Sequence, residues 1–430
     1  MKTYPVRLLS VVFLALVLPA SLGASVSVSF SPLIWGGDIQ LGYDVGDPAL
    51  PTTLELGTAA AYSSTPYFRD PDGSLYTGGR QFPETDAVFD PDEAPYFQRR
   101  LWRWNTGVRQ ALVYDRDTGT ETAGVFLRYV GIREWHEEDD QTDQLIFESA
   151  VPDTDGQPEQ EGQLLNTIRV GADVGHVVVA PVTTTRQGWD AQVVGEWGPP
   201  FLGNTILGNA DFARIGAQAR GFLRLYEAEP RGATATRPAA GVNANANATT
   251  GAAHRAARSE APASRAENTD SAGDTTGNAE RLNQFALYGG AYITGDFAFG
   301  ERVPLSARRS ILRPLFDRSG LGGTVRGYES GRYDAQAKVA GGGELRAVLP
   351  AIARADVLPG VVAYADAGAY RGLADGDREA SGVAAGGGAG LSISLFDLAT
   401  LVFYSQYALA DTRVDGSRFT PFAIGFGYHF

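Results

Sequence analysis

The sequence contains no cysteine, and after its first 24 residues it has no apolar run long enough for a membrane-spanning helix. The missing cysteine excludes a disulfide framework and thiolate metal sites. A membrane helix needs about 20 consecutive apolar residues, so helical spans are excluded beyond the N-terminus. Basic residues are in the minority, with 36 Lys and Arg against 50 Asp and Glu and a net charge of −14. Because phosphate binding needs a basic face, we expect no nucleic-acid partner.

The N-terminus has the layout of a secretory signal peptide. Two basic residues precede an apolar run from Leu8 to Leu18, and small residues follow that run. A transmembrane anchor is the alternative, but the run is too short to cross a bilayer as a helix. We therefore predict a signal peptide over residues 1–24.

One internal segment cannot build a core. Residues 227–280 contain no Ile, Leu, Phe, Tyr or Trp, so the segment cannot bury enough apolar surface to offset the entropy of ordering it. A linker between two domains is the alternative, but the patterns on its two sides have the same character. We predict a disordered low-complexity insertion over residues 227–282 within a single domain.

The chain is rich in glycine and in apolar residues that alternate with polar ones, a period of two that is typical of β-strands. In one such segment, Ile215, Leu223 and Leu225 share one face, while Arg214 and Arg220 share the other. The clearest segments with this alternation are 99–114, 188–198, 212–226 and 283–299. Each would present a continuous apolar face and a charged face, so the sequence predicts an all-β fold.

Two all-β architectures fit this alternation. A soluble sandwich would place the charged faces in water and the apolar faces in a core. The predicted strands are long, aromatic residues gather near their ends, and short connections alternate with long ones, which is typical of outer-membrane barrels. We predict a transmembrane antiparallel β-barrel over residues 25–430, with apolar side chains toward lipid and polar ones toward the lumen.

The C-terminal segment supports the barrel. Phe422, Ile424, Phe426, Tyr428 and Phe430 alternate with smaller or polar residues and end the chain on an aromatic. The pattern resembles the terminal-strand signal by which bacterial barrels are recognised by their assembly machinery, with Phe426, Tyr428 and Phe430 as its last positions. In a soluble protein, such an exposed apolar edge strand would favour aggregation.

A motif in the second half of the chain resembles a known family. The tetrapeptide Val325, Arg326, Gly327 and Tyr328 matches the V-R-G-[FY] hallmark of the BamA/TamA-type bacterial surface antigen barrels, a superfamily of outer-membrane assembly and translocation proteins. Further along, Glu344 matches the Glu of the next strand in that family. The strand after it matches an aromatic-x-Asp-x-Gly motif with Tyr364, Asp366 and Gly368. The resemblance covers roughly residues 163–430, without the insertion.

The resemblance implies a barrel of about 16 strands, although the strand count also allows about 14. It further implies that an extracellular loop folds back into the lumen. Glu344 and Asp366 fall on the polar faces of adjacent strands, so we expect the Arg326 guanidinium to bridge both carboxylates and pin the loop. A staple that only fills the pore is an equal alternative. The chain is already strand-like after the signal peptide, so we expect a branch without periplasmic POTRA domains.

These observations lead to two functional hypotheses. The first is insertion or translocation of other outer-membrane proteins, with outer-membrane lipids, client proteins or assembly machinery as partners. The second is a passive pore or a structural surface protein. An arginine ladder at residues 214, 220 and 224 could tune anion passage or pair with carboxylates in the lumen. Both hypotheses place the protein in the bacterial outer membrane.

The sequence carries no recognisable catalytic set. Its four histidines are scattered, and none has a serine or paired aspartate at a persuasive spacing. His136 lies in an acidic stretch that could bind a divalent cation weakly, but an acidic loop facing solvent is far commoner. We predict no enzymatic activity, no cofactor and no metal site. A barrel enzyme that uses His176 is the most distant alternative.

Overall fold

The computed structural model describes the strands of the protein, one connecting loop in detail and several turns. The described residues are 24–31, 36–45, 50–66, 96–115, 120–137, 162–179, 186–227, 285–314, 317–329, 331–350, 352, 357–375, 378–395, 399–410 and 417–426. The predicted signal peptide, apart from Ala24, and the predicted insertion, apart from Glu227, lie outside these residues.

The described chain is all-β and antiparallel, as predicted. Its main sheet has 14 strands, and each strand is hydrogen-bonded to its neighbours in chain order except where β9 pairs with β12. The strands are β1 (Ala24–Ser31), β2 (Gly36–Val45), β3 (Thr52–Pro66), β4 (Tyr96–Asp115), β5 (Thr120–Glu137), β6 (Gln163–Val179), β7 (Arg186–Gly198), β8 (Asp211–Glu227), β9 (Ala286–Arg302), β12 (Ala337–Val348), β13 (Val357–Asp375), β14 (Arg378–Leu395), β15 (Ala399–Ala408) and β16 (Phe419–Phe426).

Helix is almost absent from the described residues. Between β9 and β12 lie α3 (Leu305–Arg309), the two-residue strands β10 (Ser310–Ile311) and β11 (Arg318–Ser319), and α4 (Leu321–Thr324). The 3-10 turn η4 (Pro200–Leu202) joins β7 to β8. No helix in the described part of the chain is long and apolar enough to cross a membrane.

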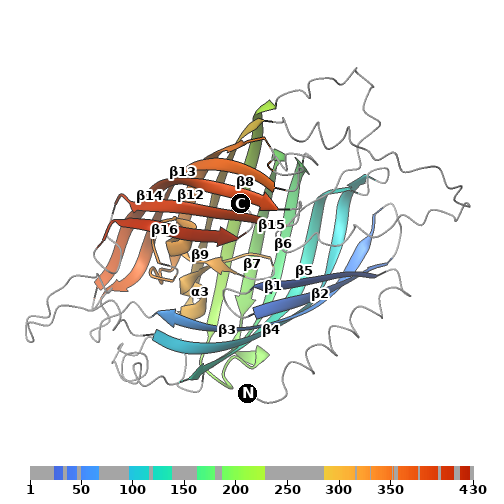
Figure 1. Ribbon diagram of the computed structural model, residues 1–430. Helices are drawn as coiled ribbons and strands as arrows, with labels where there is room; N and C mark the ends of the chain where they lie inside the picture. Colours follow the sequence, from blue (N-terminus) through green and yellow to red (C-terminus); the bar gives the residue numbers. More distant parts are fainter. Residues whose placement is uncertain are drawn as a thin grey trace, which may run out of the picture.

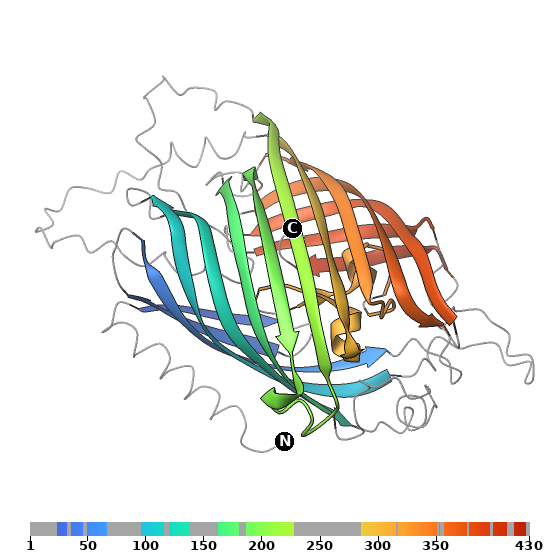
Figure 2. The same ribbon diagram turned by 180° about the vertical axis from the view of Figure 1, so that it is seen from behind.

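The sheet curves strongly. β5 to β9 form one side of the curve, and the first and last strands, β1, β2, β15 and β16, lie together on the opposite side (Figures 1 and 2). The connection between β9 and β12, with α3, lies within the curve in both views. Among the described pairings none joins β1 to β16. The described sheet has 14 strands, two fewer than the 16 that the resemblance implies.

The side chains sort by face as the alternation predicts. Along β4, β7, β8 and β9 large apolar side chains point out of the curve and are about half exposed: Trp102, Trp189, Ile215, Ile293 and Phe297. The intervening polar side chains point into the curve and are buried: Asn105, Glu196, Arg214, Thr294 and Asp296. This arrangement is the reverse of a soluble sandwich, which buries its apolar faces.

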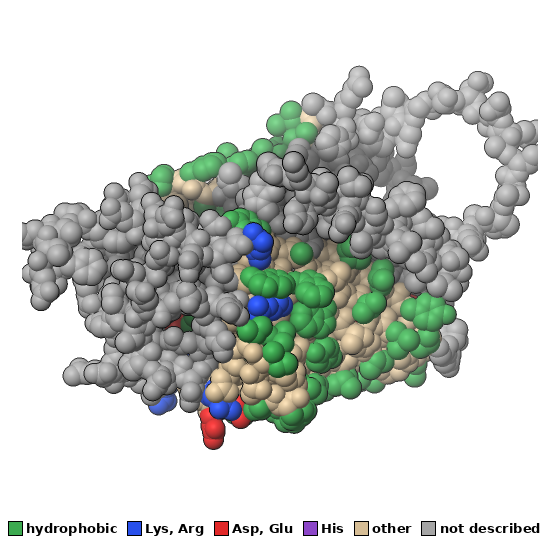
Figure 3. All heavy atoms as spheres, turned by 90° about the horizontal axis from the view of Figure 1, so that it is seen from below, with side chains coloured by type: hydrophobic (Ala, Val, Ile, Leu, Met, Phe, Trp, Pro, Cys, Tyr) green, Lys and Arg blue, Asp and Glu red, His purple; other side chains and the backbone are tan. Residues whose placement is uncertain are grey.

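A space-filling view shows the result on one face. Most of the described surface in Figure 3 consists of hydrophobic side chains and uncharged atoms, with few Lys, Arg, Asp or Glu side chains among them. Monomeric soluble proteins seldom expose apolar patches larger than a few hundred Å². The polar side chains of the sheet are buried on the concave side, where they need hydrogen-bond or ionic partners. The connection between β9 and β12 supplies many of these partners.

Candidate functional site

We refer to the connection between β9 and β12 as the inward loop. Its described residues, 303–314, 317–329 and 331–336, fold into the concave side of the sheet. Four of its apolar side chains are buried in one cluster with small residues of the surrounding sheet, which we call the wall: Leu321, Val325, Tyr328 and Tyr333. Those wall residues are Ala340 on β12, Ala384 on β14 and Ala408 on β15. The loop is thus packed against the last strands of the sheet.

The guanidinium of Arg326 reaches carboxylates on two neighbouring strands. Its Nε donates to Asp366 Oδ2 at 2.6 Å, and its Nη2 donates to Asp366 Oδ1 at 3.0 Å. Its Nη1 donates to Glu344 Oε2 at 2.7 Å. The backbone N–H of Arg326 adds a bond to Asp366 Oδ2 at 3.2 Å. A paired, charge-assisted contact of this kind is both strong and directional.

Two further wall residues complete this site. Arg346 on β12 donates from Nε to Glu344 Oε1 at 3.1 Å, so Glu344 lies between two guanidinium groups. The Tyr364 ring lies under the Arg326 guanidinium, with 3.6 Å between Cζ and the ring centroid. A desolvated cation–π contact contributes about 2 kcal/mol. We call the ionic group Arg326, Glu344, Arg346 and Asp366 the Arg326 clamp.

The strand register explains why the two carboxylates meet. β12 and β13 are antiparallel, with Glu344 opposite Tyr364 and Gly342 opposite Asp366. Glu344 and Asp366 therefore lie diagonally across the ladder on one face, within reach of a single guanidinium. The predicted bridge of both carboxylates by Arg326 is the contact found here. Its role in pinning the loop remains a proposal.

Missing side chains make room for the loop. A Cβ on Gly368 would lie 2.4 Å from Leu321 Cδ1, 2.8 Å from the Val339 carbonyl oxygen and 3.1 Å from Val325 Cγ2. Glycine is therefore the residue that lets the backbone of β13 approach the loop. In the aromatic-x-Asp-x-Gly motif, Tyr364 and Asp366 thus provide a ring and a carboxylate for Arg326, and Gly368 leaves space for the loop.

The other residues of the predicted tetrapeptide hold the loop's turn. Gly327 has φ = +105°, a conformation that a residue with a side chain adopts only at a cost. The Tyr328 hydroxyl donates to the Ala385 carbonyl oxygen at 3.0 Å, which ties the loop to β14. The Thr324 carbonyl oxygen accepts a bond from the Tyr292 hydroxyl on β9 at 2.8 Å. Val325 is fully buried.

Arg326 remains charged in this environment. Burial opposes its charge, but the hydrogen bonds and charge of Asp366, followed by the charge and hydrogen bond of Glu344, raise the pKa of Arg326 above its ordinary value. Without the loop, the wall part of the clamp has two carboxylates and one guanidinium, so it lacks one positive charge. Arg326 supplies that charge.

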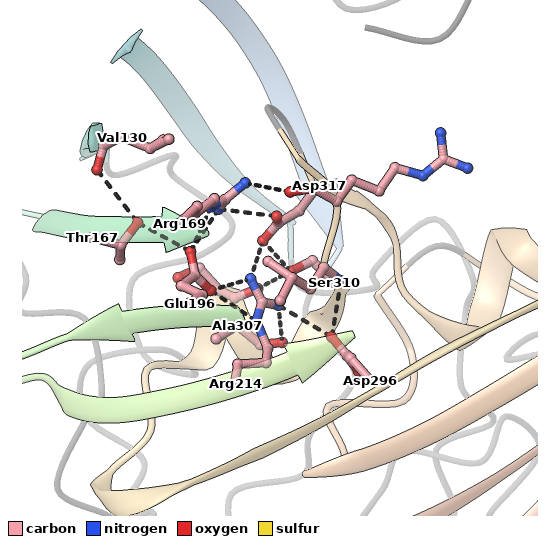
Figure 4. A network of polar contacts seen from close by, with 12 residues as sticks. Val130, Thr167, Arg169, Glu196, Arg214, Asp296, Ala307, Ser310 and Asp317 are labelled. Atoms are coloured by element: carbon pink, nitrogen blue, oxygen red, sulfur yellow. Dashed lines mark hydrogen bonds and ion pairs between the residues drawn. The ribbon is translucent and has the colours of Figure 1, made fainter. Parts of the chain in front are cut away.

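A second ionic site holds the first half of the loop (Figure 4). Arg169 on β6 and Arg214 on β8 both bind Glu196 on β7, with Nη2–Oε distances of 2.7 and 2.6 Å. The loop residue Asp317 forms an ion pair with Arg169, with 3.0 Å between Nη2 and Oδ1, and also pairs with Arg214. Three neighbouring strands and the loop therefore meet at one point.

Strands β9 and β12 extend this site. Asp296 pairs with Arg214 at 3.3 Å and with Lys338 Nζ at 3.1 Å. Asp296 Oδ2 also accepts the backbone N–H of Leu312 at 2.9 Å. We call the group Arg169, Glu196, Arg214, Asp296, Asp317 and Lys338 the Asp317 cluster.

Backbone contacts tie the same half of the loop to the cluster. Arg214 Nη1 donates to the Ala307 carbonyl oxygen and to Ser310 Oγ, both at 3.0 Å. Arg169 Nη1 donates to the Arg313 carbonyl oxygen at 2.9 Å. These bonds satisfy loop carbonyl groups that are held away from water. The loop segment around α3 is thereby attached to β6 and β8.

The charge of the loop residue is again the one that the wall lacks. The wall residues of the cluster carry three positive and two negative charges, and Asp317 supplies the missing negative charge. Burial would raise the pKa of Asp317, but the charges of Arg169 and Arg214 outweigh it. Together with hydrogen bonds from Arg214 and Ser310, they hold the pKa below its usual range.

Sequence reasoning did not predict the Asp317 cluster, although the alternation indicated the faces of several of its members. Glu196, Arg214, Asp296 and Lys338 all fall on predicted polar faces. Which of them pair depends on the register of the strands. Asp317 lies in a loop without periodicity, so no pattern marked it.

The arginine ladder pairs with carboxylates. Arg214 lies in the Asp317 cluster, Arg220 pairs with Asp190 at 2.9 Å, and Arg224 pairs with Glu227 at 2.8 Å. Of the two alternatives for this ladder, pairing with carboxylates is the one that these contacts favour.

The remaining predicted positions are less informative. Phe426 is the last residue of β16, and its side chain lies outside the described residues, as do Tyr428 and Phe430. His176 lies near the end of β6 and is exposed. In the ranges that the structure describes, no three His, Asp or Glu side chains are grouped so that they could hold a metal ion.

Comparison with solved structures gives distant similarities. No protein-family model and no curated protein matches the chain. Among solved structures, BamA from Haemophilus ducreyi lacking POTRA domains 1-3 has 12% sequence identity and a TM-score of 0.42, with 93% of this chain and 68% of that chain covered.

Two further structures are similar at the same level. CdiB from Acinetobacter baumannii has 10% identity and a TM-score of 0.43, with 93% of this chain and 52% of that chain covered. CdiB from Escherichia coli has 12% identity and a TM-score of 0.44, with 95% and 56% covered. This chain therefore spans little more than half the length of either CdiB chain. All three TM-scores are below 0.5, so these similarities support no particular activity for this chain.

Proposed function

We propose that this protein is a bacterial outer-membrane β-barrel of the BamA/TamA-like superfamily that aids the insertion or translocation of other outer-membrane proteins. The observation that carries the proposal is the sorting of side chains, with apolar groups outward, ionic groups inward and an arginine of the inward loop bound between two wall carboxylates.

The outward apolar face fits a lipid environment. Side chains such as Ile215, Ile293 and Phe297 are about half exposed along strands whose other face is ionic. Water would make this arrangement costly, at roughly 25 cal/mol per Å² of exposed apolar surface. Acyl chains remove that cost, and a spanning sheet then needs every backbone group paired within the protein.

Closure of the sheet is part of the proposal. An even number of alternating strands leaves β1 and β16 antiparallel, so the two edges are able to pair directly. They also lie on the same side of the molecule (Figure 1). The described sheet supports a barrel of 14 strands. A barrel of 16 needs two more strands from outside the described residues.

The seam between these edges is the proposed site of activity. β1 and β16 have 8 residues each, whereas β4 has 20 and β13 has 19. Short edge strands form few ladder hydrogen bonds, so this junction would open before any other. An opened edge presents unpaired N–H and C=O groups that a client strand can bind by β-augmentation.

A cross-linking experiment tests the proposal. The chain has no cysteine, so one cysteine in β1 and one in β16 give a single possible disulfide across the seam. We expect the oxidised protein to lose its ability to promote insertion of a client barrel into vesicles and to regain it on reduction. An equivalent disulfide between β4 and β5 is the control. Unchanged activity of the oxidised seam variant would contradict the proposed mechanism.

A passive surface barrel is the second candidate. The two ionic sites of the inward loop are neutral overall, which fits a stable closure of the lumen as well as a moving part. This candidate predicts constant conductance in planar bilayers and no loss of other barrels when the gene is deleted. Proteomic comparison of outer membranes with and without the gene separates the two, because an assembly role predicts loss of many barrels.

A further inference from the structure

The turn between β7 and β8, residues 199–210, carries the two most exposed large apolar side chains in the described part of the chain. Phe201 is 71% exposed and Ile206 is 69% exposed. The turn belongs neither to the Arg326 clamp nor to the Asp317 cluster. Strand alternation places it at the same end of the sheet as the inward loop.

The turn is rigid despite its exposure. Asn204 is fully buried, and its Oδ1 accepts the backbone N–H of Asn166 at 2.6 Å. Its Nδ2 donates to the carbonyl oxygens of Asn166 and Pro199 at 2.9 and 3.0 Å. The Asn166 side chain donates in turn to the Leu202 carbonyl oxygen at 3.0 Å. The turn is therefore fixed on β6 through a pair of asparagines.

Several backbone groups of the turn are paired within the protein. The N–H groups of Gly203 and Ile206 donate to the carbonyl oxygens of Pro200 and Gly203 at 3.0 and 3.1 Å. The Leu207 carbonyl oxygen accepts from the N–H of Leu164 at 3.0 Å. Pro199 and Pro200 have no N–H to satisfy. Such pairing favours a position at the edge of a hydrocarbon layer, because unpaired polar groups there are costly.

The turn carries no charge, and its largest exposed side chains are apolar. Residues 198–210 contain no Lys, Arg, Asp or Glu. The Phe201 ring meets the ring of Trp197 edge to face, with centroids 5.4 Å apart. Trp197 is itself exposed on the outward face of β7. Through this ring contact, the apolar outer surface of β7 extends onto the turn at Phe201.

We propose that this turn is a lipid anchor: Phe201 and Ile206 insert among the acyl chains at the edge of the bilayer, in the leaflet next to the inward-loop end of the sheet. The proposal rests on the proposed membrane location. Lipid is the occupant because the turn offers no charge to a polar partner and continues the outward apolar wall. The anchor fixes the height of β7 and β8, the strands that carry Glu196 and Arg214, relative to the membrane.

Site-directed fluorescence tests this proposal. Because the chain has no cysteine, single variants Phe201→Cys and Ile206→Cys can each be labelled with an environment-sensitive fluorophore. The labelled protein is placed in phosphatidylcholine vesicles with or without bromine on the acyl chains. Ile215→Cys on the outward face of β8 is the lipid reference, and Asn209→Cys, exposed on the same turn, is the water reference.

We expect labels at positions 201 and 206 to be quenched by brominated lipid at least half as strongly as the label at 215, and the label at 209 to be quenched weakly. If positions 201 and 206 behave like 209 while 215 is quenched, the anchor is wrong and the membrane location stands. If 215 is not quenched, the proposed membrane location fails as well. Shielding of 201 and 206 in native membranes, but not in these vesicles, would indicate a protein partner and overturn the lipid assignment.

Discussion

The two halves of the inward loop are fastened by opposite charges. At the Arg326 clamp the loop supplies a cation to a wall that has an excess of carboxylate. At the Asp317 cluster the loop supplies a carboxylate to a wall that has an excess of cations. Lys338 and Glu344, which belong to the two sites, are six residues apart on β12, or about 20 Å of strand.

This difference in charge specifies the orientation of the loop relative to the sheet. If its two halves exchanged places, Arg326 would face arginines and Asp317 would face carboxylates, and like charges at such distances are unfavourable. The wall charges therefore specify which half of the loop lies against which strands. The sites also differ in burial, since the side chain of Asp366 is fully buried and that of Asp317 is 12% exposed. We expect the clamp to contribute more to stability than the cluster.

Removal of both loop charges should have the largest effect. The double variant Arg326→Ala, Asp317→Ala removes every ion pair between the loop side chains and the two sites. Only bonds to the loop backbone and to Ser310 Oγ remain there, so we expect the loop to leave the lumen. Single-channel conductance should then rise well above the level of either single variant, and the loop should become sensitive to protease. If the double variant conducts no more than the single variants, the two sites are not the fastenings of the loop.

Loss of the clamp alone should be the next largest effect. Arg326→Ala leaves Asp366 buried without its main partner, which costs about 3–5 kcal/mol. We expect a lower temperature for the heat-dependent shift in gel mobility and faster proteolysis of the loop. Arg326→Lys keeps the charge but loses the paired geometry, so it should recover only part of the loss. Equal behaviour of the Ala variant and the unaltered protein would exclude a pinning role.

Space for the loop can be tested separately from charge. Gly368→Ala places a Cβ 2.8 Å from a backbone oxygen and 2.4 Å from Leu321, and overpacking of this kind costs about 1–3 kcal/mol. The matched control is Gly343→Ala on β12, where the nearest atom would be 3.7 Å away. Denaturation in urea should show a lower midpoint for the first variant only. A similar loss in both variants would point to a general effect of replacing glycine.

The cluster should show a pH dependence of smaller size. The pKa of Asp317 is held below its usual range in the fold, so its stabilisation is present above the unfolded value near 4 and is lost as pH falls further. We expect Asp317→Asn to be less stable than the unaltered protein by about 1–2 kcal/mol from pH 8 to pH 5. The difference should shrink below about pH 4, as followed by urea denaturation. A difference that is independent of pH down to about pH 2 would contradict the role of this charge.

Much of the fold follows from local pattern. The alternation along 212–226 predicted both the strand β8 and the faces on which Ile215 and Arg214 lie, because a strand turns each successive side chain over. The Arg326 contacts could be predicted because they depend on a recognisable motif and on two polar faces that are adjacent in the chain. Strand number was harder to predict, because the alternation does not fix how many strands residues 25–98 contain.

The Asp317 cluster illustrates what local pattern cannot give. Its members come from β6, β7, β8, β9, β12 and the loop, and their meeting depends on how five strands are staggered. A shift of register by two residues would keep every face polar and would break every pair. The proposed lipid anchor could not be predicted from the sequence for a similar reason. The exposure of Phe201 indicates a function only in a turn that is held in place, and the burial of Asn204 is visible only in the structure.

The most direct test of the account is the behaviour of the purified mature protein without detergent. If apolar side chains face acyl chains and ionic side chains face the lumen, refolding should require detergent or phospholipid vesicles, and the folded protein should float with the vesicles on a density gradient. A protein that stays monodisperse in detergent-free buffer by light scattering, and that does not associate with vesicles, would contradict this sorting of side chains.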